Sequence, residues 1–185
     1  MPPGPITRIM VMGPPGSGKS TLARMLGERL GLPVHHADAL FHDPGWVARP
    51  REDFIADMVA IAAQPAWVID GNYSGAHYGP AIADRLARAE RIILLDLPRR
   101  VTIPRILRRV ARHHGQQRPD SAAGCPERLD WAFLGYCWQW RRAVRPGILR
   151  VLAGVEDRVI WFRRSPGLDR VLADMDSLGL RLSSG

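Results

Sequence analysis

Residues 13–20 read Gly-Pro-Pro-Gly-Ser-Gly-Lys-Ser, and this stretch decides the fold. It matches the pattern G-x-x-x-x-G-K-[ST], in which glycine-rich backbone surrounds phosphate groups. Residues 6–12 before it predict a strand, and residues 21–30 after it carry apolar side chains at helical spacing. A strand, a tight turn and a helix start direct several backbone N–H groups at one point, where the helix dipole also favours an anion. The stretch therefore predicts a site for the phosphates of a nucleotide.

Two side chains of this loop have the chemistry for a triphosphate and its metal. Lys19 is the single lysine among 26 basic residues, and its ammonium is a compact charge that can follow the β- and γ-phosphates. The Ser20 hydroxyl is a ligand suited to Mg²⁺. We therefore expect ATP and Mg²⁺ as cofactors. The predicted nucleotide-binding residues are Gly13, Pro14, Pro15, Gly16, Ser17, Gly18, Lys19, Ser20 and Thr21.

The composition indicates one globular domain. The chain has 185 residues, of which 46% are hydrophobic, and a net charge of +8, which excludes a disordered or collagen-like chain and a large multidomain enzyme. No apolar run reaches the length of a membrane span, and the first residues lack the pattern of a signal peptide. With only Cys125 and Cys137, a disulfide framework is not expected. We expect a cytoplasmic protein, either a monomer or a homodimer.

Strand and helix patterns alternate along the rest of the chain, which predicts an α/β fold. Further strands are expected at residues 33–36, 67–69, 91–96 and 158–162. Further helices are expected at residues 54–62, 80–89, 98–112, 130–145 and 168–178. Apolar strands alternating with helices specify a parallel sheet covered on both faces, a three-layer α/β/α arrangement. No internal repeat or linker divides the sequence, so residues 1–185 are interpreted as a single domain.

Three aspartates, Asp38, Asp70 and Asp96, end predicted strands. Ligands in parallel sheets bind at the carboxyl ends of strands, so all three are expected on the edge that holds the phosphate loop. Phosphoryl transfer needs one carboxylate for Mg²⁺ and one to take a proton from the acceptor. We assign Asp70 to the metal, together with Ser20, and Asp38 to the acceptor. Asp96 precedes a Leu-Pro helix-start signature, so capping of the next helix explains it as well as chemistry does.

A basic segment between residues 97 and 119 holds seven arginines and no acid. Four of them share one helical face: Arg105, Arg108, Arg109 and Arg112. A solvated basic face is the ordinary interpretation, but unpaired arginines repel one another unless a polyanion lies between them. The triphosphate of a nucleotide or a nucleic-acid backbone meets that need. We expect Arg109 to bind the nucleotide and Arg112 to assist catalysis.

Residues 113–127 show no periodicity and are long for a plain connection, which favours a lid over about residues 112–129. Closure would exclude water, and Arg118 would neutralise charge on the transferring phosphoryl group. His113, His114 and Cys125 also suggest a zinc site, but the set of ligands is incomplete and exposed histidines are the simpler interpretation.

Five aromatic residues lie within the helix expected at 130–145: Trp131, Phe133, Tyr136, Trp138 and Trp140. Such residues can stack on bases, but their helical spacing favours a role in the core.

Several motifs, taken in order, resemble those of the bacterial topology modulation proteins, within the adenylate-kinase-like P-loop kinases. The resembling stretches are residues 13–21, 35–46 (His-His-Ala-Asp-Ala-Leu-Phe-His-Asp-Pro-Gly-Trp), 68–73 (Val-Ile-Asp-Gly-Asn-Tyr), 94–99, 118–120, 124–127 and 130–145. The resemblance implies a P-loop NTPase fold with a five-stranded parallel sheet in the order 2-3-1-4-5. It also implies a lid and an acceptor-binding region at about residues 38–66.

By the same resemblance, the residues expected to meet the acceptor are Asp38, Trp46, Gly71, Asn72 and Tyr73. Asp70-Gly71 is similar to the Asp-Gly that adenylate kinases carry after the third strand, which Phe-Pro-Arg follows there. The arginine of that motif holds the AMP phosphate, whereas this chain continues Asn72-Tyr73-Ser74. AMP is therefore disfavoured, and a hydroxyl acceptor with Asp38 as base, as in the related shikimate- and gluconate-type kinases, fits better.

The preferred hypothesis is Mg²⁺-dependent phosphoryl transfer from ATP to a hydroxyl or phosphate of a small molecule. The alternative is a nucleotide-dependent DNA-binding protein that modulates DNA topology, suggested by the charge of +8, the arginine segment and the name of the similar family. It ranks lower because no DNA-reading motif is visible. A third hypothesis is a P-loop protein that binds nucleotide as a switch without turnover.

Overall fold

The computed structural model describes residues 6–75, 78–117 and 120–182. Its centre is a parallel sheet of five strands in the order β2-β5-β1-β6-β7. The strands are β1 (Arg8–Met12), β2 (Val34–His36), β5 (Trp67–Asp70), β6 (Arg91–Leu95) and β7 (Val159–Phe162). Counted along these five strands alone, the order is 2-3-1-4-5, and the predicted fold is confirmed.

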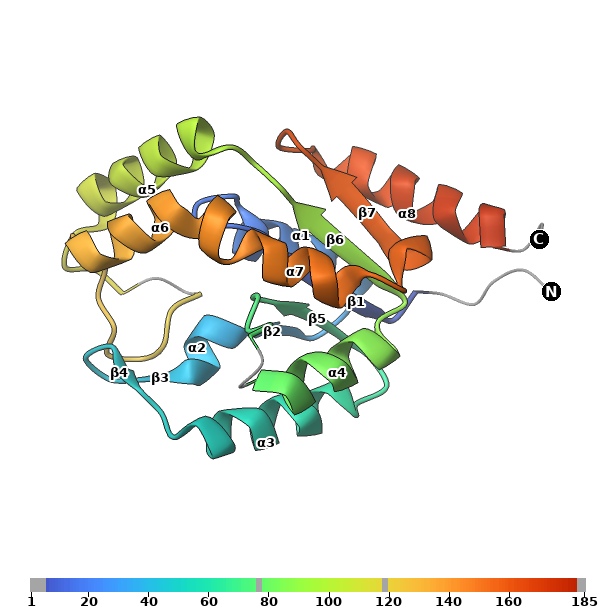
Figure 1. Ribbon diagram of the computed structural model, residues 1–185, viewed down its shortest axis with the longest axis horizontal. Helices are drawn as coiled ribbons and strands as arrows, with labels where there is room; N and C mark the ends of the chain where they lie inside the picture. Colours follow the sequence, from blue (N-terminus) through green and yellow to red (C-terminus); the bar gives the residue numbers. More distant parts are fainter. Residues whose placement is uncertain (1–5, 76–77, 118–119, 183–185) are drawn as a thin grey trace.

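Helices cover both faces of the sheet (Figure 1). They are α1 (Lys19–Leu30), α2 (Ala37–Phe41), α3 (Arg51–Ala62), α4 (Gly79–Arg88), α5 (Arg99–His113), α6 (Trp131–Ala143), α7 (Arg145–Leu152) and α8 (Leu168–Leu182). A short 3₁₀ helix, η2 (Glu156–Arg158), precedes β7. The predicted three-layer arrangement is therefore present.

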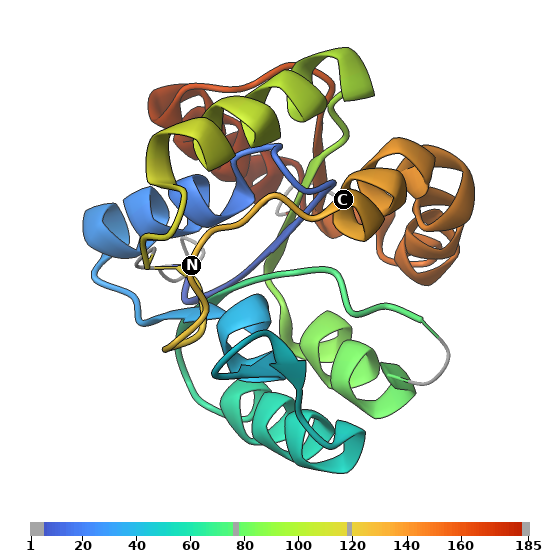
Figure 2. The same cartoon turned by 90° about the vertical axis from the view of Figure 1, so that its left-hand side faces the viewer.

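The alternation of side chains along β1 explains the two layers. Ile9 and Val11 pack into a core with α1 and α8, whereas Met10 and Met12 pack into a second core with α2, α3, α4, α6 and α7. Figure 2 shows α3 and α4 on the side of the sheet opposite α1 and α8. Because both faces of the central strand are buried, its sequence is continuously apolar.

Three local features differ from the sequence expectation. Asp38 does not end a strand, because β2 ends at His36 and Asp38 lies in the first turn of the short helix α2. Residues 42–48 form a small antiparallel hairpin of β3 (His42–Asp43) and β4 (Val47–Ala48), which no apolar pattern announced. The helix expected at 130–145 corresponds to α6, which ends at Ala143, and a further helix that was not expected, α7, follows from Arg145 with Pro146 in its first turn. Proline lacks an N–H group, so it fits a helix start and not a helix interior.

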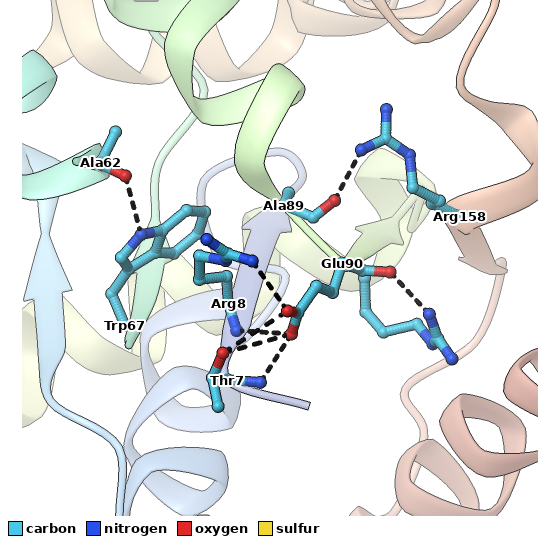
Figure 3. Close-up of polar contacts among 8 residues, drawn as sticks. Thr7, Arg8, Ala62, Trp67, Ala89, Glu90 and Arg158 are labelled. Atoms are coloured by element: carbon cyan, nitrogen blue, oxygen red, sulfur yellow. Dashed lines mark hydrogen bonds and ion pairs between the residues drawn. The ribbon is translucent and has the colours of Figure 1, made fainter. Parts of the chain in front are cut away.

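A polar network holds the amino-terminal edge of the sheet, away from the phosphate loop (Figure 3). The Glu90 carboxylate accepts hydrogen bonds from the backbone N–H of Thr7 at 2.6 Å and of Arg8 at 3.1 Å. The Arg8 guanidinium lies 3.0 Å from the same carboxylate. This network ties the start of β1 to the start of β6 and leaves the opposite edge for ligands.

Candidate active site

The phosphate loop has the backbone geometry that its glycines predict. Gly16 and Gly18 have φ of 75° and 92°, in the left-handed region. A Cβ on Gly16 would also lie 2.6 Å from the Thr102 carbonyl oxygen of α5. Helix α1 begins at Lys19 without a side-chain cap, so its first N–H groups face the loop without a side-chain acceptor. Among the described residues, the buried Ser17 hydroxyl has no hydrogen-bond partner, so it is available as a donor to a bound anion.

Asp70, at the end of β5, lies directly behind the loop. Its carboxylate accepts a hydrogen bond from the Ser20 hydroxyl at 2.6 Å and lies 2.7 Å from Nδ1 of His36. Burial alone would raise the pKa of Asp70, but the His36 hydrogen bond and the charge of Lys19 outweigh it and lower the pKa. The side chain is 3% exposed and is therefore a buried carboxylate that stays ionised.

Ser20 and Asp70 offer hard oxygen donors of the kind Mg²⁺ prefers. No group of three or more His, Cys, Asp or Glu side chains in the described part of the chain is arranged to hold a metal ion. One hydroxyl with one carboxylate behind it matches a cation that takes its other ligands from water and substrate phosphates. The residues present thus fit the Mg²⁺ of a nucleotide.

Asn72 braces the phosphate loop from the neighbouring strand end. Its Oδ1 accepts a hydrogen bond from the Gly13 N–H at 3.0 Å, and its Nδ2 donates to the Gly13 carbonyl at 2.9 Å. The sequence predicted Asn72 as an acceptor-binding residue. It does line the cavity described below, but its amide is engaged with the loop.

Tyr73 holds the candidate base. Its hydroxyl donates a hydrogen bond to Asp38 Oδ1 at 3.0 Å. Burial, followed by the negative charge of Asp38, raises the pKa of Tyr73 far above its ordinary value, so the phenol remains a donor. The ring lies among Phe41, Phe54 and Tyr78, with ring centroids 4.6–5.4 Å away. This aromatic packing places an exposed carboxylate at the open side of the site.

A single cavity of about 690 Å³ joins these parts. The predicted site residues that line it are Pro15, Gly16, Lys19, Ser20, Asp38, Trp46, Asn72, Tyr73 and Arg109. The other predicted residues that the structure describes lie outside its lining. Asp70 lies behind Ser20, Gly71 begins the turn that follows β5, and Arg112 lies on the exposed side of α5. The remaining ones belong to the phosphate loop and the start of α1: Gly13, Pro14, Ser17, Gly18 and Thr21. Arg118 lies outside the described residues.

The cavity also has lining residues that the sequence did not indicate. They include Ser74, Gly75, Tyr78, Arg128, Asp130 and Arg150. These residues come from the segment before α4, from the segment before α6 and from α7, so long-range packing brings them together. The sequence contained one signal for these residues, which is Arg150 as the only charged side chain among the apolar residues in the last turn of α7.

The sequence suggested that the arginine face of α5 has no acidic partner, but the structure places a carboxylate beside it. Arg109 lies 3.0 Å from the Glu127 carboxylate, which arrives from the predicted lid. Arg105 donates to the Ser165 hydroxyl at 2.8 Å. The pairing was invisible in the sequence because Glu127 lies 18 residues further along the chain.

The described part of the predicted lid lies against the β3–β4 hairpin. The Gly45 N–H donates to the Gly124 carbonyl at 2.9 Å, and the Trp46 indole N–H donates to the Pro126 carbonyl at 2.9 Å. The Cys125 thiol is fully buried in this contact, 3.2 Å from the Asp43 carbonyl. The segment therefore packs on the hairpin, and Glu127 of the segment and Trp46 of the hairpin both line the cavity.

Asp96 does not cap a helix. Helix α5 has Pro98 at its N-cap with no side-chain hydrogen bond, and the buried Asp96 carboxylate instead accepts two-pronged hydrogen bonds from Arg145 at 2.8–3.0 Å. The capping interpretation is wrong, and Asp96 forms a structural ion pair between the end of β6 and the start of α7.

The aromatic residues of α6 do not all enter the core. Trp140 is buried, but Trp131 is 77% exposed and Trp138 is 57% exposed. The Arg99 guanidinium lies over the Trp138 ring, 4.0 Å from its centroid. A short helix packed on one side cannot bury aromatic residues that lie all around it.

Comparisons with known proteins show similarity to kinases. No family model matches the chain. A cytidylate kinase from Aeropyrum pernix is 33% identical over 111 residues, which cover 54% of this chain and 63% of that protein. The match thus spans less than two thirds of the relative.

None of the described helices is long and apolar enough to cross a membrane.

Solved kinase structures have the same fold over almost the whole chain. A gluconokinase from Sinorhizobium meliloti has a TM-score of 0.56 at 18% identity, covering 98% of this chain and 96% of that chain. Shikimate kinase from Acinetobacter baumannii, in complex with shikimate, has a TM-score of 0.58 at 20% identity, covering 97% and 94%. Shikimate kinase from Aquifex aeolicus has a TM-score of 0.55 at 16% identity, covering 96% and 98%. The chain therefore has the P-loop NTPase fold of these kinases.

Proposed function

We propose that this protein transfers the γ-phosphoryl group of ATP to a hydroxyl group of a small molecule. The observation that carries the proposal is one cavity with Lys19 and Ser20 at one end and an ionisable carboxylate, Asp38, at the other. The kinase relatives support the reaction type, because their names describe phosphoryl transfer to small molecules. The motifs shared with topology modulation proteins support placing the chain in that group.

Each part of the site has one task in this proposal. The backbone of residues 13–21 and the Lys19 ammonium hold the phosphates, while Ser20 and Asp70 would hold Mg²⁺. The metal supplies charge neutralisation on the β- and γ-phosphates when bound. Arg109 and Arg118 add positive charge from α5 and the lid, and Arg112 does so from the end of α5. Positioning and electrostatics then supply most of the rate enhancement.

Asp38 takes the proton of the acceptor. As the acceptor oxygen bonds to the γ-phosphorus, the bond from that phosphorus to the β–γ bridging oxygen breaks and ADP leaves. The hydroxyl proton passes to the Asp38 carboxylate, which Tyr73 orients. A phosphate acceptor, as the name of cytidylate kinase implies for that protein, would not need this base.

The test combines binding and turnover. Calorimetry should show that Lys19→Ala weakens Mg·ATP binding by about 100-fold, because a charge-assisted contact to the phosphates is lost. Arg29→Ala, which removes an exposed cation from the same helix, should leave the affinity unchanged. ADP release is then screened against polyols, sugars, hydroxy acids and nucleoside monophosphates, with Asp38→Asn as the variant. Unchanged affinity in Lys19→Ala, or acceptor-dependent turnover that survives Asp38→Asn, would contradict the assignments.

The second candidate function is nucleotide-dependent DNA binding. The sequence from residue 99 to residue 152 contains 12 arginines against three acids, and two tryptophans on the same region are exposed. Charge and stacking surfaces of this kind suit a nucleic acid. Fluorescence anisotropy with duplex and single-stranded DNA across a salt series decides this candidate, since submicromolar binding with a steep negative salt slope supports it and no binding removes it.

A further inference from the structure

Arg85 of α4 is a fully buried arginine outside the cavity lining. Its guanidinium donates to four backbone carbonyls, those of Ala81 at 2.9 Å, Gly71 at 3.1 Å, Asn72 at 3.0 Å and Tyr73 at 3.2 Å. No ion pair to Arg85 is present among the described residues. Burial lowers the pKa of this guanidinium to about 10, against a small opposing contribution from Tyr73.

Burying a charge without an acid partner is costly, and an apolar side chain of similar size would fill the same space. What an apolar residue cannot do is bind three successive carbonyls, at Gly71, Asn72 and Tyr73. This turn has a left-handed φ of 126° at Gly71 and 37° at Tyr73, and the second is unfavourable for a residue with a Cβ. The guanidinium therefore stabilises a turn that the chain would otherwise avoid.

The same turn carries two side chains that reach opposite halves of the site. Asn72 binds both backbone groups of Gly13 at the start of the phosphate loop, and Tyr73 binds the Asp38 carboxylate. Displacement of the turn would move both contacts at once. The distance between the nucleotide end and the acceptor end of the cavity thus depends on how this turn is held.

We propose that Arg85 is a positioning residue, which fixes the 71–73 turn and thereby sets the phosphate loop and Asp38 relative to one another. The role of Arg85 in catalysis rests on the proposed function, whereas its hold on the 71–73 turn can be tested in the protein without nucleotide. Arg85 does not line the cavity, so we expect no direct contact with the nucleotide or the acceptor.

Arg91 provides a matched control within the same chain. It is also a buried arginine, and its guanidinium donates to the backbone carbonyls of Met175 at 3.1 Å and Glu90 at 2.7 Å. These contacts lie at the amino-terminal edge of β6, remote from the cavity. Arg91→Lys therefore measures the cost of disturbing a buried arginine with no link to the site.

The experiment compares Arg85→Lys and Arg85→Met with Arg91→Lys, at a temperature where circular dichroism shows each variant folded. Calorimetry with Mg·ATP measures affinity, and hydrogen exchange of the nucleotide-free protein measures protection of residues 13–18 and 70–75. Arg85→Lys should raise the Kd by about tenfold and speed exchange in both segments, while Arg91→Lys does neither. If Arg85→Met does not fold, Arg85→Lys, which retains the charge, carries the comparison.

A double-variant cycle tests the route. In an Asn72→Ala background, Arg85→Lys should raise the Kd by no more than about twofold, because the link to Gly13 is already gone. Full additivity, or an unchanged Kd and unchanged exchange in Arg85→Lys, would overturn the inference. A wild-type protein that binds no Mg·ATP would refute the proposed function alone, since the exchange comparison would still judge Arg85.

Discussion

Replacing Asp70 by asparagine keeps the shape of the side chain and removes its charge, which tests its assignment to Mg²⁺. The carboxylate lies outside the cavity lining, one hydrogen bond of 2.6 Å behind the Ser20 hydroxyl. We therefore expect it to act on a bound Mg²⁺ through an intervening group and not as a direct ligand. Changes at such positions cost about 10- to 100-fold in affinity, equivalent to about 1.4–2.7 kcal/mol.

The assay is calorimetric titration of ATP with excess Mg²⁺ and with EDTA. For the wild type, Mg²⁺ should strengthen ATP binding, and in Asp70→Asn this gain should shrink by the factor above. Binding in EDTA should be unchanged or stronger in the variant, because a negative charge near the phosphates is gone. The quantity compared is thus the ratio of the two affinities.

Asp96→Asn is the control, since Asp96 is an equally buried strand-end carboxylate that pairs with Arg145. Its Mg²⁺-dependent gain should equal that of the wild type. If Asp70→Asn retains the full gain, or if Asp96→Asn loses it, the metal role has been assigned to the wrong carboxylate.

Two further predictions concern stability. Arg145→Met should lower the free energy of unfolding, measured in urea, by about 3 kcal/mol, because it leaves the buried Asp96 carboxylate with only Arg141, 4.0 Å away. The double variant Asp96→Leu/Arg145→Met should recover most of this loss. An Arg145→Met protein as stable as the wild type would contradict the reasoning. The second prediction concerns Glu90. Burial alone would raise the pKa of its carboxyl group, but hydrogen bonds from Thr7 and Arg8 outweigh burial and lower this pKa below its ordinary value of 4.5. Its stabilisation is therefore present above pH 4.5 and lost as the pH falls through the folded-state pKa. The free energies of unfolding of the wild type and of Glu90→Gln, measured across pH, should become equal in acid. A difference that stays constant at every pH would contradict this prediction.

The sheet and the phosphate loop were predictable because their signals are local. Apolar runs, glycines and helical spacing each depend on residues within a few positions, and these set β1, the loop and α1. Helix α2, the β3–β4 hairpin and α7 were missed, because short elements contain too few residues for a clear periodic pattern. The order of the strands came from a resemblance of motifs and not from periodicity.

The sequence predicted which residues line the candidate site better than it predicted their hydrogen-bond and ion-pair partners. Lys19, Asp38 and Tyr73 line one cavity as expected, but Asn72 braces the loop and Arg109 pairs with Glu127. A residue type at a strand end indicates a possible role, whereas its hydrogen-bond partner depends on which other segment packs beside it.

The sequence by itself determined that a glycine loop between a strand and a helix would present N–H groups and one lysine to an anion, because that geometry is built from adjacent residues. Tertiary structure alone decided that Asn72 would meet Gly13, 59 residues away, and that Tyr73 would meet Asp38, 35 residues away. It also decided that the buried Arg85 would bind the turn from which both side chains project. Contacts of this kind depend on how helices pack on the two faces of the sheet, and no short-range pattern encodes them.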